Sequence, residues 1–286
     1  MKINNEWKDY KLITTGDGEK IESFAGITLL RPDPQVIWKA PFTMQQYKGI
    51  AAHYHRSKTG GGAWEVKEKV PDAFYIHWRD LTFELKLMNF KHVGIFPEQA
   101  VNWSRMIDLI KKSDREIRIL NLFGYTGGAT VACAKAGAKV CHVDAAKAMC
   151  DVAKTNCRLS DVPEENTRFI VDDCVKFVEK EIRRGKKYDA IIMDPPSYGR
   201  GPKGEMWKIE EKIFDLVDLT KTLLSDKPLF YLINSYTTGL QAGVMKNILE
   251  IVLKEYSNKK TDADEIGIEG DDGLVLPCGC SAFTEF

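Results

Sequence analysis

The sequence predicts an α/β protein, with a Rossmann-like, doubly wound sheet of seven strands and a small β-rich domain before it. Two observations lead to this prediction. From residue 116 onward, short apolar segments alternate with segments of helical spacing, which is typical of a parallel sheet covered on both faces. Before about residue 90, the apolar segments are short and rich in aromatic and β-branched residues, with turn residues between them.

Each expected element can be placed along the chain in order. In the N-terminal domain, residues 1–90, strands are expected within 27–38 and 72–87, and a helix follows over 98–113, where apolar residues recur at helical spacing. The further strands are expected at 116–122, 138–144, 167–172, 188–194, 228–235, 261–269 and 273–286. The helices between them are expected at 127–137, 145–160, 174–185, 208–224 and 241–256.

Composition and charge limit the class of protein. The chain has 286 residues with 41 basic and 41 acidic side chains, so no net field draws nucleic acid to the whole molecule, although a local patch can still do so. No apolar run approaches the ~20 residues of a membrane span, and the first residues lack the apolar core of a signal peptide. We therefore expect no membrane partner. For the oligomeric state, we expect a monomer or a homodimer.

The cysteines indicate a reducing compartment. The chain has seven, an odd number. Five of them fall within predicted helices and strands, namely Cys133, Cys141, Cys150, Cys157 and Cys174. Disulfides of secreted proteins more often join loops, so this placement predicts reduced thiols and a cytoplasmic protein.

A glycine-rich loop follows the strand at 116–122. The loop contains Gly124, Gly127 and Gly128, and the next strand ends in Asp144. In a doubly wound sheet, ligands bind at the carboxyl ends of the strands, where glycines let a ligand approach the backbone. Because Asp144 can accept hydrogen bonds from both hydroxyls of a ribose, the segment predicts a nucleoside cofactor.

The glycine spacing separates two classes of cofactor. The dinucleotide fingerprint is G-x-G-x-x-G/A, and counting from Gly124 its second glycine falls on Thr126. A β-branched residue there obstructs a pyrophosphate, which favours S-adenosylmethionine, a cofactor without one. A nicotinamide-dependent enzyme or a non-catalytic nucleotide-binding protein remains the alternative.

A rigid turn follows the strand at 188–194. Asp194 is succeeded by Pro195 and Pro196, which lack backbone donors and fix φ, so the turn presents Asp194, Ser197 and Tyr198 at the strand end. Asp172 and Asp173 follow the preceding strand, where a carboxylate can accept a hydrogen bond from the adenine amine of the cofactor. The Asp-Pro-Pro turn follows the next strand, so we expect it at the point where the methyl donor meets its acceptor. The predicted catalytic residues are Asp194, Pro195, Pro196, Ser197 and Tyr198.

Basic and aromatic residues follow this turn. Arg200 and Lys203 can contact phosphate, while Tyr198 and Trp207 can stack on a base, so these four residues are the predicted substrate site. An ordinary surface loop is the alternative. No metal is expected, because the one histidine pair in the sequence, at 53 and 55, has no cysteine or acidic cluster near it in the chain.

Together these motifs resemble the class I S-adenosylmethionine-dependent methyltransferases, in the branch related to bacterial large-subunit ribosomal RNA methyltransferases. The resemblance covers roughly residues 90 to 286, and it implies a methyltransferase domain over 91–286. It is carried by NLFGYTGGATVACAKAGA, VDAAKAM, FIVDDCVKF, YDAIIMDPPSYGRG and LVLPCG.

The resemblance also implies the cofactor contacts. The loop from Phe123 to Gly127 would hold the methionine part, Asp144 and Ala145 the ribose and adenine, and Asp173 with Cys174 would border the adenine. The segment HVGIFPEQ resembles the part of the family that enters the pocket. The full predicted set is Phe96, Gln99, Asn121, Phe123, Gly124, Tyr125, Thr126, Gly127, Asp144, Ala145, Asp173, Cys174 and Asp194.

The acceptor atom is indicated by an absence in the sequence. Relatives that methylate carbon 5 of cytosine need a cysteine nucleophile after the fifth strand or the Asp-Pro-Pro turn, where this chain has Ser235 and Ser197. Cys278 and Cys280, in the last strand, are expected to be structural. A nitrogen of an RNA base, in ribosomal RNA by resemblance, is therefore the predicted acceptor. A protein or a small molecule is the alternative, because the family's N-terminal RNA-recognition module is not recognisable.

Overall fold

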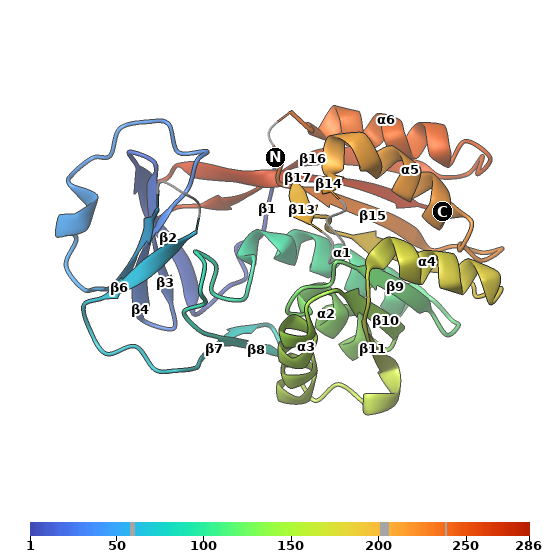
Figure 1. The fold of residues 1–286 in the computed structure, drawn as a ribbon, viewed down its shortest axis with the longest axis horizontal. Helices are drawn as coiled ribbons and strands as arrows, with labels where there is room; N and C mark the ends of the chain where they lie inside the picture. The colour runs from blue at the N-terminus through green and yellow to red at the C-terminus, as the bar shows by residue number, and fades with distance from the viewer. Residues whose placement is uncertain (58–60, 201–205, 238) are drawn as a thin grey trace. The chain divides into compact units, whose positions relative to one another are not determined.

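The computed structural model describes residues 1–57, 61–200, 206–237 and 239–286 (Figure 1). The chain forms two compact units, each described by itself below. The larger unit consists of Met1–Lys2, Val101–Ile266 and Gly279–Phe286. The β-rich unit consists of Ile3–Ala100 and Gly267–Cys278. The β-rich unit thus includes the tip of the C-terminal hairpin as well as the N-terminal segment.

The larger unit is built on an eight-stranded sheet with the order β1-β16-β17-β15-β12-β9-β10-β11. Seven of these strands occupy the expected segments, and the two-residue β1 adds an eighth at the edge. The α/β prediction is therefore confirmed. The strands are β1 (Lys2–Ile3), β9 (Arg118–Leu122), β10 (Lys139–Asp144), β11 (Thr167–Val171), β12 (Ala190–Met193), β15 (Phe230–Ser235), β16 (Lys260–Glu269) and β17 (Val275–Glu285).

The direction of the strands brings the predicted loops together at the carboxyl ends of the parallel strands. Strands β11, β10, β9, β12 and β15 are mutually parallel, and β17 runs antiparallel to β15. Val143 pairs with Leu122, and Leu122 pairs with Met193, so β10, β9 and β12 end side by side. The loops that follow these three strands consequently lie next to one another.

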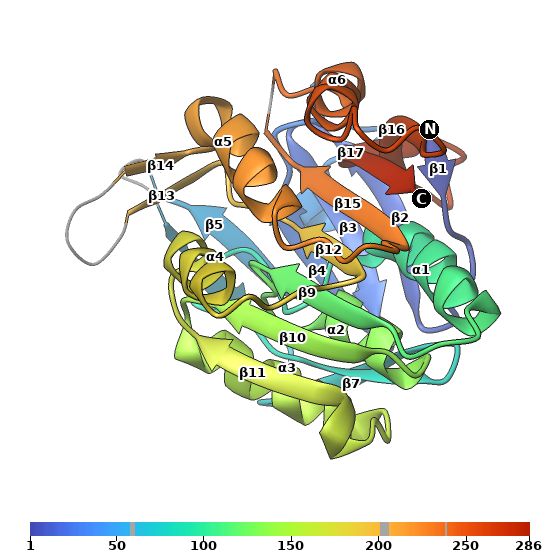
Figure 2. The ribbon, with the colours of Figure 1, turned by 90° about the vertical axis from the view of Figure 1, so that its right-hand side faces the viewer.

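Helices cover both faces of this sheet, with α4, α5 and α6 on one side and α1, α2 and α3 on the other (Figure 2). Strand β12 is apolar and buried throughout, as expected for a strand with two covered faces. Apolar residues of α5 and α6, including Leu216 and Leu249, pack with Leu122 and Ile233 of the sheet. The helices are α1 (Ala100–Lys112), α2 (Gly128–Lys135), α3 (Lys147–Leu159), α4 (Cys174–Arg183), α5 (Ile209–Lys221) and α6 (Ala242–Val252). None of the helices within the described residues is long and apolar enough to cross a membrane.

The β-rich unit contains a five-stranded sheet in sequential order, β2 to β6, and a separate hairpin of β7 and β8. The segment expected as a strand over 27–38 is a strand only as far as Pro32, because Pro32 and Pro34 cannot donate to a ladder. The strands are β2 (Tyr10–Gly16), β3 (Glu19–Phe24), β4 (Ile27–Pro32), β5 (Ile50–Arg56), β6 (Gly62–Val66), β7 (Phe74–Trp78) and β8 (Leu81–Leu85). Strands β4 and β5 are parallel, and β5 and β6 are antiparallel.

Candidate active site

The loop after β9 has a strained backbone. Phe123 and Tyr125 have φ values of 55° and 50°, and Gly127 has 86°. Side chains other than glycine rarely adopt this left-handed region, which costs on the order of 1–3 kcal/mol per residue and is concentrated at functional sites. Two backbone hydrogen bonds hold the turn, from Gly124 N–H to the Val143 carbonyl at 3.0 Å and from Gly127 N–H to the Gly124 carbonyl at 3.0 Å.

The three glycines of this loop are required by the packing beneath it. A Cβ on Gly124 would lie 2.4 Å from the imidazole of His142, and one on Gly127 would lie 2.8 Å from the Cβ of Ala153. A Cβ on Gly128 would lie 2.5 Å from the indole of Trp103. The neighbours come from β10, α3 and α1, so this role of the glycines could not be predicted from the sequence around them.

Asp144 ties the glycine loop to the end of β10. One carboxylate oxygen accepts the backbone N–H of Tyr125 at 2.9 Å, and the other accepts that of Ala146 at 2.8 Å. A carboxylate offers about four lone-pair sites, so two remain for the hydroxyls of a ribose. Ala145, the next residue, is exposed at the same edge.

Three predicted contact residues are buried within the loop or next to it. Asn121 is buried and donates to the hydroxyl of Thr130 at 2.8 Å. Thr126 is buried, and its carbonyl accepts from the side chain of Asn156 at 2.8 Å. The buried sulfur of Cys174 accepts the backbone N–H of Phe123 at 3.3 Å, and burial raises the pKa of this thiol well above its ordinary value. The side chains of Asn121 and Cys174 and the backbone carbonyl of Thr126 are therefore used in contacts within the protein, and the contact of these residues with the cofactor stays a prediction.

The acidic pair after β11 has local partners. Asp173 is the N-cap of α4, where its carboxylate accepts the backbone N–H of Lys176 at 3.0 Å. Asp172 forms an ion pair with Lys180 at 2.6 Å. Asp173 therefore has a structural role as a helix cap, and its predicted contact to adenine stays a prediction.

Phe96 and Gln99 belong to the β-rich unit. Phe96 precedes the short 3-10 helix η2 (Pro97–Gln99), and its ring lies 5.0 Å from that of His92. Gln99 is buried. Their place in the cofactor pocket stays a prediction.

The Asp-Pro-Pro turn follows β12 as expected. Asp194 is half-buried and Pro195 is buried. The next three residues, Pro196, Ser197 and Tyr198, are exposed. The carbonyl of Pro196 accepts the indole N–H of Trp207 at 2.6 Å. The turn therefore presents exposed groups beside the carboxyl end of β12, the edge at which a ligand is expected.

The segment after this turn is a hairpin, where the sequence suggested a loop. Strands β13 (Tyr198–Arg200) and β14 (Met206–Lys208) pair antiparallel, so that Tyr198 lies opposite Lys208. Lys203 lies outside the described residues. The hairpin holds Trp207 5.5 Å from the ring of Phe123, measured between ring centroids. An aromatic pair thus connects the predicted acceptor turn with the glycine loop.

The two serines at the expected cysteine positions are hydrogen-bonded. The Ser197 hydroxyl accepts from that of Thr237 at 2.6 Å, and the Ser235 hydroxyl accepts the backbone N–H of Thr237 at 3.2 Å. Cys280 pairs with Ser235 across β17 and β15, which the sequence did not indicate. Its thiol is buried, donates to the Leu240 carbonyl at 3.1 Å, and has a pKa raised by burial to about 11, so it is protonated near neutral pH.

Comparisons with known proteins identify the family of this chain. A family model described as S-adenosylmethionine-dependent methyltransferase matches residues 30–239. The chain therefore belongs to the S-adenosylmethionine-dependent methyltransferase family, and its cofactor is S-adenosylmethionine. This confirms the resemblance noted in the sequence. The residues fit the cofactor, because Asp144 retains free lone pairs at the ribose position and Thr126 occupies the place where a dinucleotide needs glycine.

Individual relatives can be named. The crystal structure of an S-adenosylmethionine-dependent methyltransferase from Agrobacterium tumefaciens superposes with a TM-score of 0.91 at 31% identity, covering 99% of this chain and 92% of that one. The ribosomal RNA large subunit methyltransferase K of Neisseria meningitidis is 25% identical over 87% of this chain and 71% of its own. A putative ribosomal RNA large subunit methyltransferase of Methanocaldococcus jannaschii is 34% identical over 38% of this chain, but the match spans only 28% of that protein.

Proposed function

We propose that this protein transfers the methyl group of S-adenosylmethionine to a nitrogen of an RNA base, with ribosomal RNA as the substrate. The contact between Trp207 and Phe123, at 5.5 Å between ring centroids, carries the proposal. It puts an aromatic surface of the acceptor hairpin beside the loop that the family uses for its cofactor. Aromatic side chains in such a position can stack on an unpaired base. The names of the Neisseria and Methanocaldococcus relatives support RNA as the acceptor.

The Asp-Pro-Pro turn would orient the acceptor. The carboxylate of Asp194 and the carbonyl groups of the turn can accept hydrogen bonds from an amino group, which directs the nitrogen lone pair toward the methyl carbon. The cofactor supplies an electrophilic methyl group on a sulfonium. The carbon–sulfur bond would break as the nitrogen–carbon bond forms, its electron pair would go to sulfur, and the proton of the nitrogen would pass to water. Pro195 and Pro196 keep the turn rigid, so little reorganisation is needed at the moment of reaction.

A nitrogen acceptor is favoured over carbon 5 of cytosine. Carbon at that position becomes nucleophilic only after a thiolate adds to the ring. The corresponding positions hold Ser197 and Ser235, and the nearby Cys280 thiol is buried and protonated. A nitrogen lone pair needs no such nucleophile.

The domain boundaries and the cellular location of the protein are also proposals. We take residues 91–286 as the methyltransferase domain and 1–90 as a separate N-terminal domain. A cytoplasmic location is supported by the cysteines, all seven of which are free thiols.

The experiment is a methyl-transfer assay with tritiated S-adenosylmethionine on total RNA from a strain that lacks this gene. We expect the wild-type protein to label RNA, and nucleoside mass spectrometry to find the label on a base nitrogen. Asp194→Ala should retain cofactor binding and lose at least about a hundredfold in rate, since preorganised positioning supplies several kcal/mol.

Asp114→Ala is the matched control, because this exposed carboxylate precedes β9 at the opposite edge of the sheet. It should label RNA at the wild-type rate. If Asp194→Ala labels RNA as well as the wild type, the role given to the turn is wrong. If the wild type labels only protein or small metabolites, the RNA substrate is wrong.

A further inference from the structure

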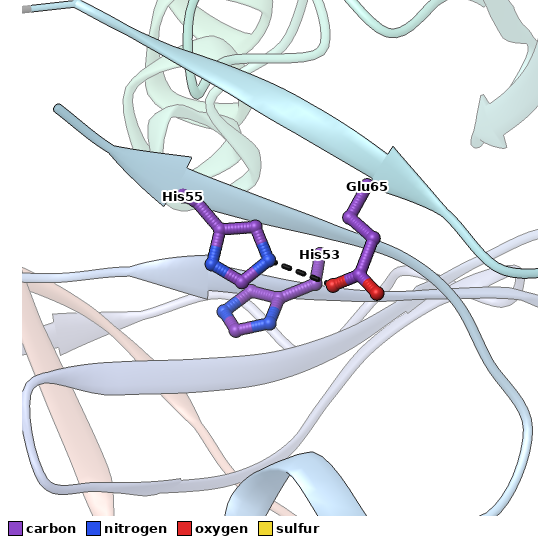
Figure 3. A group of neighbouring side chains, drawn as sticks. All are labelled: His53, His55 and Glu65. Carbon is purple, nitrogen blue, oxygen red and sulfur yellow. Dashed lines mark hydrogen bonds and ion pairs between the residues drawn. The ribbon is translucent and has the colours of Figure 1, made fainter.

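We infer that the β-rich unit contains a binding site for a divalent transition-metal ion, formed by His53, His55 and Glu65 (Figure 3). The potential ligand atoms of these three side chains all lie within 4.8 Å of one another. The site is separate from the methyl-transfer chemistry and does not depend on the proposed function.

The sheet brings the three side chains together. His53 and His55 are two residues apart on β5, so both side chains point to the same face of the strand. Glu65 lies on β6 directly opposite His53 in the antiparallel register. Figure 3 shows the two imidazoles next to each other with the carboxylate beside them. Their ring planes are tilted by 45° and their centroids are 3.9 Å apart. The expectation of no metal rested on the lack of acidic neighbours in the chain, and the fold supplies one from another strand.

One hydrogen bond within the cluster would give way to a metal ion. His55 Nε2 lies 2.8 Å from an oxygen of Glu65. A metal ion coordinated by both rings and the carboxylate would take the place of this hydrogen bond.

A second carboxylate positions the buried histidine. Glu19 of β3 lies 2.7 Å from Nε2 of His53, and it also accepts from the side chain of Gln45 at 2.6 Å. Histidines that bind metals usually donate their other ring N–H to a carboxylate or carbonyl, which fixes the tautomer and strengthens the ligand. With Nε2 held by Glu19, the Nδ1 of His53 is the atom left for a metal. This pairing is an observation independent of the cluster itself.

The donor set selects the kind of metal. Two imidazole nitrogens and one carboxylate oxygen suit Zn²⁺ and other late first-row ions, whereas Mg²⁺ and Ca²⁺ prefer oxygen ligands. The side chains of His55 and Glu65 are each 53% exposed, so a water molecule can complete the coordination. Tetrahedral zinc with bonds of ~2.1 Å separates its ligand atoms by roughly 3.4 Å, and these two exposed side chains can rotate to reach that spacing.

The chain offers a matched control. His77 Nδ1 lies 2.8 Å from the carboxylate of Asp9, and its side chain is 58% exposed. This pair has the same chemistry and similar exposure but lacks the second histidine. A metal that binds any surface histidine would bind it equally well.

The experiment is isothermal titration of chelator-treated, full-length protein with ZnCl₂, followed by MgCl₂ as a second titrant. We expect one saturable zinc site and no magnesium binding. His55→Gln and Glu65→Gln should each weaken zinc binding at least tenfold, and Glu19→Gln by about 10–100-fold. His77→Gln should bind zinc like the wild type. Zinc should also raise the melting temperature of the wild type and of His77→Gln, but not of His55→Gln.

Three results would overturn the site. They are the absence of saturable zinc binding to the wild type, wild-type affinity in both His55→Gln and Glu65→Gln, or an equal loss in His77→Gln. His55 and Glu65 are exposed, so their variants should fold, and circular dichroism of the metal-free proteins checks this. None of these measurements uses methyl transfer, so the outcome is independent of the substrate.

Discussion

At the scale of single residues, the site depends on groups that serve two purposes. Asp144 holds the amides of Tyr125 and Ala146 and still has lone pairs for a ribose. Asp173 caps α4 and was also predicted to border the adenine. Such residues cannot be tested by loss of activity alone, because their removal also changes the shape of the loops. A measurement of cofactor affinity beside one of stability separates the two effects.

We predict that Asp144→Ala weakens binding of S-adenosylhomocysteine by about 1.5–3 kcal/mol, the usual value for hydrogen bonds to a charged group. Asp144→Asn should lose less, because it keeps one oxygen acceptor. The measurement is titration calorimetry. Asp151→Ala is the control, since this exposed carboxylate of α3 pairs only with lysines among the described residues and should leave affinity unchanged. Unchanged affinity in Asp144→Ala would contradict the ribose assignment.

His142 predicts a pH dependence of stability. Its ring is buried against Gly124, and its Nδ1 shares a hydrogen bond of 2.9 Å with the hydroxyl of Thr130. Burial lowers the pKa of His142 from 6.5 to about 4. Between pH 6.5 and 4, the imidazole is therefore protonated in the unfolded chain but not in the folded chain. Stability is fully present above pH 6.5 and falls as the pH drops toward 4.

Urea unfolding between pH 7 and pH 4 checks this. The wild type should lose stability relative to His142→Gln as the pH falls, because the glutamine does not titrate. A constant difference between the two proteins across this range would contradict the prediction, because it would mean that the imidazole titrates equally in the folded and unfolded states.

At the scale of elements, the hairpin of β13 and β14 connects the acceptor turn to the cofactor loop. Trp207 is its anchor, since its indole N–H donates to the Pro196 carbonyl and its ring contacts Phe123. Both partners belong to predicted site segments. In the proposed function, the hairpin would set the distance between the stacked base and the methyl group of the cofactor.

We predict that Trp207→Ala raises the KM for RNA more than it lowers kcat, because stacking contributes about 1–3 kcal/mol per base. Trp207→Phe should show a smaller increase, since it keeps the ring but loses the hydrogen bond to Pro196. Steady-state kinetics on the RNA identified in the methylation assay measure both constants. A fall in kcat with an unchanged KM would instead place Trp207 in the chemical step.

At the scale of the whole molecule, the charge is balanced, with 41 basic and 41 acidic residues. Any attraction for RNA must then come from local surfaces. Binding of the nucleoside cofactor does not depend on this charge balance, and it adds to the stability of the folded protein whatever the substrate is.

We predict that S-adenosylhomocysteine at 100 times its dissociation constant stabilises the protein by roughly 2.7 kcal/mol, while NAD at the same concentration does not. A thermal-shift assay detects the difference. The Asp144→Ala variant serves as control, since its shift at the same ligand concentration should be smaller. Stabilisation by NAD alone would contradict the cofactor assignment.

The sequence by itself determined the fold class and the family, and it predicted a site at the carboxyl ends of the parallel strands. Alternating apolar periodicity is a local property, so β9, β10 and β12 and the helices between them could be placed from neighbouring residues alone. Asp144 and Asp194 could be predicted as site residues because each stands at the end of an apolar strand segment. Proline at 195 and 196 indicated a rigid turn without any knowledge of its surroundings.

Only the tertiary structure decided which residues from distant segments meet. His142, Trp103 and Ala153 require the glycines of the loop, yet they come from three other elements. The contact of Trp207 with Phe123 depends on a hairpin that periodicity could not indicate, since its strands are three residues long. Glu65 reaches the histidines of β5 through strand register. Strand order and register depend on the packing of the whole chain, which no local pattern contains.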